Sequence, residues 1–193
     1  MVEMGTAGRI ASAALAILIE EGAPAVTMRR VAADAGVTTM ATYRHYPSRE
    51  ALLRTVADTA FAELGQDWGK RCEALDFESR LDGLMRDFLD FALGTPNLYT
   101  FLITDRREGA RRFPEDFREG GSPALTPVIA AVEQGMREGA LRPDDSLEVT
   151  LAITTPAEGL VQLYLGGRIG LSEHDFRALC KRTIGRILNG LRA

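Results

Sequence analysis

The residues best suited to chemistry in this sequence are arginines and small hydroxyl side chains that gather between Thr27 and Arg49. This window contains four arginines against one acid, whereas residues 51–193 contain 18 basic and 22 acidic side chains. A guanidinium group forms charge-assisted bonds to phosphate and paired bonds to guanine. On a chain of net charge −4, the basic window indicates a protein that contacts nucleic acid with one end. A chance cluster of surface charge would give the same counts, so only the spacing of the residues can distinguish it from a site that contacts nucleic acid.

The spacing within this window favours two short helices joined by a tight turn. Residues 27–50 run Thr-Met-Arg-Arg-Val-Ala-Ala-Asp-Ala-Gly-Val-Thr-Thr-Met-Ala-Thr-Tyr-Arg-His-Tyr-Pro-Ser-Arg-Glu. Thr27 and Thr38 are each placed to cap a helix, and Gly36 between them accepts the positive φ of a sharp turn. The second helix presents small side chains, which allow it to approach base edges closely. These features are the mechanics of a helix-turn-helix that places its second helix in the major groove of DNA.

This segment resembles the DNA-binding part of the tetracycline-repressor (TetR) family of bacterial regulators. The family pattern, Thr-x-x-x-[Ile/Val]-Ala-x-x-Ala-Gly-Val-[Ser/Thr]-x-x-x-x-Tyr-x-[His/Tyr]-[Phe/Tyr]-x-[Ser/Asn]-[Lys/Arg], is matched from Thr27 to Arg49. The resemblance covers the first third of the chain, and the remainder matches only in length and helix layout. Two positions depart from the pattern, because Thr42 stands where the family usually has leucine and Arg49 where it often has lysine. The Thr42 hydroxyl can bond to a carbonyl one turn back, and Arg49 retains the positive charge.

The resemblance also implies which side chains contact DNA. Contacts to phosphate are implied for Thr27, Thr38, Tyr43, His45 and Arg49. Contacts to base edges are implied for Arg29, Thr39, Met40, Ala41 and Arg44. Arginine chemistry agrees for Arg29 and Arg44, since each can bond to a guanine edge through two donors. Packing between the third and fourth helices is the alternative role for Tyr43, His45 and Tyr46.

The elements expected to position these residues are helices, because apolar residues recur at helical spacing and no long stretch alternates with period two. We therefore predict an all-α protein. Residues 1–50 form an N-terminal domain with the three helices of the helix-turn-helix, and a long fourth helix from Ser48 links it to the rest. Residues 51–193 form a larger helical domain for ligand binding and dimerisation. Its helices are predicted over 77–93, 96–104, 123–138, 145–168 and 173–191, with a solvated connector over 105–122.

A ligand cavity among the helices after residue 50 is a further implication of the resemblance. Aromatic side chains that could line it are Trp68, Phe88 and Phe91, although a helical body needs such residues equally for its core. Polar groups on apolar helices are a more specific indication, because a buried carboxylate without a partner is costly. These groups are Thr155, Glu158 and Gln162. We expect a mainly apolar effector of modest size, oriented by these few polar groups.

The last two predicted helices indicate an interface, because the first of them is apolar on most sides between Leu147 and Leu165 and other surfaces must cover it. The final helix alone contains Phe176, Cys180, Ile184, Ile187, Leu188 and Leu191. Pairing of both helices with their symmetry mates would give a four-helix bundle, which is the homodimer that the resemblance implies. The predicted partners are thus a second copy of the chain, a palindromic double-stranded DNA operator and a small-molecule effector.

Several other classes of protein are disfavoured by the sequence. No apolar run reaches the length of a membrane span and the N-terminus lacks a signal-peptide pattern, so we expect a cytoplasmic protein. Cys72 and Cys180 do not form the spacing of a disulfide framework or a metal knuckle. We see no catalytic cluster and no phosphate-binding loop, and expect neither an enzyme nor a bound metal or cofactor. The function we expect is a repressor that the effector releases from its operator. The alternative is a DNA-binding regulator or activator whose C-terminal domain docks a protein partner.

Overall fold

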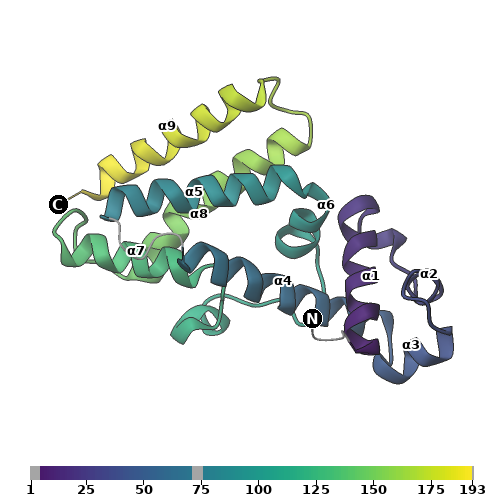
Figure 1. The fold of residues 1–193 in the computed structure, drawn as a ribbon. Helices are drawn as coiled ribbons and strands as arrows, with labels where there is room; N and C mark the ends of the chain where they lie inside the picture. Colours follow the sequence, from purple (N-terminus) through teal and green to yellow (C-terminus); the bar gives the residue numbers. More distant parts are fainter. Residues whose placement is uncertain (1–4, 71–75, 193) are drawn as a thin grey trace. The chain divides into compact units, whose positions relative to one another are not determined.

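The computed structural model describes residues 5–70 and 76–192, and within these ranges the protein is built from helices without a β-strand (Figure 1). The prediction of an all-α fold is therefore confirmed. The chain divides into two compact units, of which the first comprises Met1–Phe61 with Thr95–Ala110 and the second Ala62–Gly94 with Arg111–Ala193. The predicted domain boundary at residue 50 remains a prediction about which part of the chain folds alone.

The first unit contains the predicted helix-turn-helix and a later segment of the chain. Its elements are α1 (Thr6–Glu21), η1 (Ala23–Ala25), α2 (Met28–Asp34), α3 (Thr39–His45), the start of α4 (Arg49–Lys70), α6 (Pro96–Tyr99) and the π-helix η2 (Thr100–Thr104). Figure 1 shows α2 and α3 lying beside α1. Ile10, Ala14 and Leu18 recur at helical spacing on α1 and are fully buried, so one face of α1 contributes to the core of this unit.

The end of α1 is fixed by residues that are distant in sequence. Gly22 has φ 85°, a conformation that suits glycine, and its N–H donates to the Leu18 carbonyl, so the helix stops there. The Asn97 side chain, at the start of α6, donates from Nδ2 to the carbonyls of Ile19 (3.1 Å) and Glu20 (3.2 Å). These carbonyls belong to the last turn of α1 and have no partner within the helix, so Asn97 satisfies acceptors that would otherwise need water.

The second unit packs four longer helices around one apolar cluster. They are α5 (Phe77–Gly94), α7 (Thr126–Arg137), α8 (Ser146–Leu165) and α9 (Glu173–Leu191), with the 3₁₀ helix η3 (Glu115–Gly120) before α7. Their bounds agree with the predicted ranges to within a few residues. Gly135 permits close packing of α7 on α5, because a Cβ there would lie 2.8 Å from the Phe77 ring.

The final helix contributes more to the core of its own chain than the sequence pattern indicates. Phe176, Cys180 and Ile184 are buried, with exposed fractions of 0%, 0% and 5%, within the single chain. Burial raises the pKa of the Cys180 thiol to about 11, so this cysteine remains protonated at neutral pH. Cys72 lies outside the described residues.

Candidate nucleic-acid interface

Two threonines fix the starts of the helices that would meet DNA. The Thr27 hydroxyl accepts from the Arg30 N–H (3.3 Å) at the start of α2, and the Thr38 hydroxyl accepts from the Ala41 N–H (3.1 Å) at the start of α3. Both side chains are exposed. A hydroxyl that accepts one bond can still donate its proton, so each threonine can cap its helix and donate to a phosphate oxygen. Both predicted caps are confirmed.

The turn between α2 and α3 is fixed by backbone bonds around one glycine. Gly36 has φ 65°, a conformation that side chains with a Cβ rarely adopt. The Val37 N–H donates back to the Ala32 carbonyl at 2.9 Å, which closes the end of α2. The angle between the two helices is thus held by local hydrogen bonds.

The outer face of α3 exposes large side chains that do not pack into the core. Met40 has an exposed fraction of 71% and Tyr43 of 47%, and Arg44 next to Tyr43 is exposed as well. These three positions share one helical face, since they are separated by three and four residues. An exposed methionine beside an aromatic and a cationic side chain gives a surface that can contact base edges and the thymine methyl group.

The opposite face of α3 explains one departure from the family pattern. Thr42 is fully buried, and its hydroxyl donates to the Thr38 carbonyl one turn earlier at 3.3 Å. A buried hydroxyl without such a bond would be costly. Thr42 is therefore a core residue with a satisfied polar group, and the predicted bond of its hydroxyl is confirmed.

The two neighbouring arginines of α2 differ in their surroundings. Arg30 donates from Nη1 to Glu21 Oε2 at 2.8 Å, and its bond lowers the pKa of the Glu21 carboxyl. Its Nε also lies 3.9 Å from Asp34 Oδ2. Arg29, the residue before Arg30, is exposed, whereas its other neighbour Met28 is buried. Arg29 is thus the better candidate for a contact to DNA.

Arg49 has a role that the sequence did not reveal. Its Nε donates to the Val26 carbonyl at 2.6 Å, and its Nη2 donates to the Ala23 carbonyl. The side chain is half-buried and joins the start of α4 to the segment that leads into α2. Arg49 therefore helps to position the helix-turn-helix, and its contact to phosphate remains a prediction.

The aromatic residues near the end of α3 divide between packing and exposure. The Tyr46 hydroxyl donates to the Ala7 carbonyl of α1 at 3.2 Å, and partial burial raises the pKa of this phenol. Tyr43 and His45 are exposed, so they do not take the packing role that was their alternative. Thr39 and Ala41, the other two residues expected to approach bases, are half-buried on α3.

The six residues predicted to hold a ligand all belong to the second unit, but they differ in burial. Trp68 is 9% exposed and contacts Phe91 edge to face at 6.3 Å between ring centroids, and Phe88 packs against the same cluster. Glu158 is half-buried, and burial raises the pKa of its carboxyl. Thr155 and Gln162 are exposed on α8. Their role in binding an effector remains a prediction.

Two further observations concern metal sites and membrane-spanning helices. In the described ranges, no group of three His, Cys, Asp or Glu side chains is arranged to hold a metal ion. None of the described helices is long and apolar enough to cross a membrane.

Two family models match the chain, one over the helix-turn-helix and one over most of the chain after residue 80. The model for bacterial regulatory proteins of the tetR family matches residues 10–56, and the model for the tetracyclin repressor-like C-terminal domain matches residues 81–187. Proteins of this family are transcription regulators rather than enzymes.

Individual proteins with similar sequence or fold agree with these models. The nucleoid occlusion factor SlmA of Marinobacter nauticus is 28% identical over 171 residues, which cover 83% of this chain and 80% of that protein. A protein with unknown function from Rhodococcus sp. RHA1 has the same fold, with a TM-score of 0.79 at 21% identity over 98% of this chain and 96% of the other. The transcriptional regulator FadR from Bacillus subtilis, in complex with stearoyl-CoA, has a TM-score of 0.75 at 16% identity over 95% and 98% of the two chains.

Proposed function

The chain belongs to the TetR family of DNA-binding transcriptional regulators, and we propose that it is a repressor released from a palindromic operator by a small, mainly apolar effector. The observation that supports this proposal best is the exposed face of α3, where Met40, Tyr43 and Arg44 stand on a helix fixed at both ends. Because its target would be chromosomal DNA, we propose that the protein acts in the cytoplasm.

The contacts to DNA divide into positioning and base recognition. Thr27 and Thr38 donate to phosphate oxygens from the starts of α2 and α3, where the helix N-termini also favour an anion. Arg44 and Arg29 bond to base edges in the major groove, and Met40 contacts an apolar part of a base. Phosphate contacts make binding steeply dependent on salt, because they release counterions from DNA.

We propose that two copies of the chain pair through the outer face of α8. Ala152, Thr155 and Gly159 are exposed at helical spacing, and Leu163, one turn further on, is 45% exposed. From Ala152 to Leu163 this face has no charged side chain, and the exposed Glu148 lies one turn earlier, although a helix face directed to water normally has several charges. A symmetric dimer uses the same face of both copies, which suits a surface of small residues. Gln162 extends the same face, so Thr155 and Gln162 serve this interface as an alternative to an effector.

Release by an effector requires that the effector prefer the conformation that does not bind DNA. Two recognition helices must lie roughly 34–36 Å apart to enter successive major grooves, so a small change in their separation disrupts binding. A coupling free energy of ~1–3 kcal/mol is sufficient for a clear response. FadR from Bacillus subtilis, which has a similar fold, forms a complex with stearoyl-CoA, and this complex supports a mainly apolar effector for the present chain.

Selection of binding sites from random double-stranded DNA tests the proposal. We expect the full chain to select two similar half-sites related by a two-fold axis, with centres one helical turn of DNA apart or a multiple of it. Selection of a single unpaired half-site would contradict the proposed dimer on a palindrome. Failure to enrich any sequence would contradict specific DNA recognition altogether.

A second function is favoured by one observation. The relative that is 28% identical is a nucleoid occlusion factor, so DNA binding in this chain can serve a role other than control of a promoter. Such a protein would engage another protein through its second unit. Many selected sites spread over the genome, outside promoters, would favour this function, whereas a few sites at promoters would favour the repressor.

A further inference from the structure

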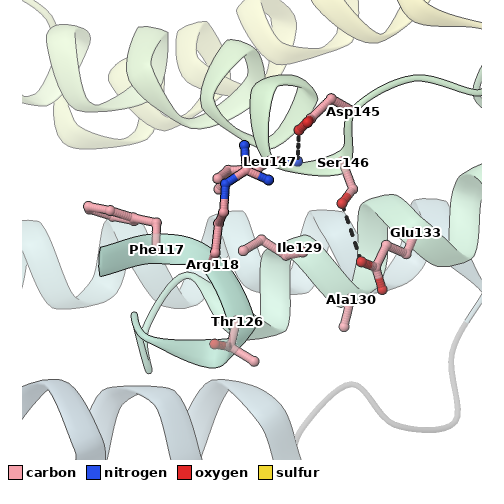
Figure 2. Close-up of a pocket in the computed structure, with 9 residues that line it drawn as sticks. All are labelled: Phe117, Arg118, Thr126, Ile129, Ala130, Glu133, Asp145, Ser146 and Leu147. Atoms are coloured by element: carbon pink, nitrogen blue, oxygen red, sulfur yellow. Dashed lines mark hydrogen bonds between the residues drawn. The ribbon is translucent and has the colours of Figure 1, made fainter. Parts of the chain in front are cut away.

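A groove on the second unit brings together three segments that the sequence does not mark as a site. Figure 2 shows side chains from η3, from α7 and from the start of α8 around it. Its volume is about 470 Å³, which is within the range of about 300–1,000 Å³ for sites of small molecules. None of the six residues predicted to hold the effector lines this groove, so it is a separate candidate site.

The middle of the groove is apolar. Ile129 of α7 is half-buried there, Leu147 at the start of α8 is 6% exposed, and Phe117 of η3 adds an aromatic ring at one end. In Figure 2 the Ile129 side chain lies between the side chains of η3 and those of the α8 start. A ligand with an aliphatic or aromatic body would replace water over these residues, which stabilises binding.

The groove has side chains of both charges along its walls. In Figure 2 the Arg118 side chain of η3 runs toward Leu147 at the start of α8, Asp145 lies just before α8, and Glu133 of α7 lies further along the groove. The Ser146 hydroxyl donates to Glu133 Oε1 at 3.2 Å, and Asp145 Oδ1 accepts from the backbone N–H of Leu147 at 2.9 Å. These bonds fix the orientation of both carboxylates and use one oxygen of each.

None of these three charged groups forms an ion pair with another residue in the part of the chain that the structure describes. Elsewhere in the same unit charged groups do pair, for example Arg177 with Asp90 at 2.7 Å. Charges of both signs along an apolar groove, with donors on Arg118 and one remaining oxygen on each carboxylate, suit a ligand with complementary charges.

We propose that this groove binds a small zwitterion with an apolar body, of the size of an apolar dipeptide. Its carboxylate accepts bonds from Arg118, and its ammonium group donates to Glu133 and Asp145, while its side chains cover Ile129 and Leu147. A simple anion would meet two carboxylates against one arginine. A purely apolar molecule would leave all three charges desolvated without partners. The site does not depend on the proposed role in transcription.

Titration calorimetry of the full chain with leucyl-leucine tests the proposal, because this probe has both termini charged. We expect saturable binding with one molecule per chain in the absence of DNA. Blocking either end, as N-acetyl-leucyl-leucine or as leucyl-leucine amide, is expected to weaken binding about tenfold or more, because each removes a charge-assisted contact. Absence of saturable binding at millimolar probe overturns the proposal, and so does equal binding of the probe and both blocked forms.

Two variants locate the binding in this groove. In Arg118→Gln, amidation of the probe should no longer matter, whereas acetylation should still weaken binding. In Glu133→Gln the pattern should reverse. Arg137→Gln, an exposed arginine of α7 outside the groove, is the matched control and should leave all three affinities unchanged. Unchanged dependence on the blocked ends in both groove variants would place the binding elsewhere and overturn the proposal.

Discussion

The outer face of α3 and the groove between η3, α7 and α8 both expose charged and apolar side chains, but different causes position them. On α3, the caps Thr27 and Thr38 and the glycine turn are bonds between residues that are close in sequence. Around the groove, Arg118 and Asp145 line one surface only because η3, α7 and the start of α8 come together there in the fold. A surface built from local bonds leaves a pattern in the sequence, whereas a surface built from tertiary packing leaves none.

The same distinction explains which parts of the molecule the sequence predicted. The bounds of α5 and α9, the caps at Thr27 and Thr38, and the bond of the Thr42 hydroxyl to the carbonyl one turn earlier all follow from neighbours within a few residues. The bonds of Arg49 to carbonyls 23 and 26 residues earlier could not be predicted, because spacing alone does not show which distant carbonyls lack donors. For the same reason the sequence did not show that Asn97 caps the end of α1.

A substitution in the core at α9 should cost far more stability than one on the exposed face of α3. Ile184 is 5% exposed and belongs to the apolar cluster of the second unit. Ile184→Arg is expected to reduce the free energy of unfolding by more than about 3 kcal/mol, because it places an unpaired charge in the core. Met40→Arg, at a position that is 71% exposed, should change it by less than about 0.5 kcal/mol. Urea unfolding followed by circular dichroism measures both, and similar losses would contradict the assigned burial.

Gly159→Arg on α8 tests the proposed dimer interface without disturbing the core. The space around Gly159 is open, since a Cβ there would meet no atom within 4 Å, so the folded chain accommodates the new side chain. We expect a folded monomer by light scattering after size exclusion, because the variant would bury an unpaired cationic side chain from each copy at the proposed interface. Gln66→Arg, on the exposed side of α4, is the control and should remain dimeric. A dimer of Gly159→Arg would show that the interface lies elsewhere.

Arg49→Met tests whether a charged residue at the helix-turn-helix acts on the fold. Loss of the two donors leaves the Ala23 and Val26 carbonyls without these bonds, so the free energy of unfolding should fall by about 1–3 kcal/mol. Arg29→Met, which removes an exposed arginine, should change stability by less than about 0.5 kcal/mol while it weakens DNA binding. Equal stability of the two variants in urea would mean that the Arg49 bonds contribute nothing to the fold.

The smallest expected effect concerns the ion pair between Glu21 and Arg30. The Arg30 bond lowers the pKa of Glu21 below its ordinary value of 4.5 in the folded state. The pair therefore stabilises the fold above the unfolded pKa, and this contribution disappears as the pH falls through the lower, folded pKa. Both groups are exposed, so the effect is small. The urea midpoint of Glu21→Gln should approach that of the native sequence as the solution becomes more acidic, and a constant difference at all pH values would argue against the pair.

If the exposed face of α3 recognises specific bases, Arg44→Ala should change the base preference of the protein. The measurement is the affinity of the native chain and of this variant for the selected DNA site and for every single-base change in it. We expect Arg44→Ala to lose about 1–3 kcal/mol of discrimination between bases at one position in each half-site and to keep it at the other positions. Arg30→Ala, whose side chain is paired with Glu21, should retain the native preference at every position. An unchanged preference in Arg44→Ala, or the same loss in Arg30→Ala, would contradict recognition by this face.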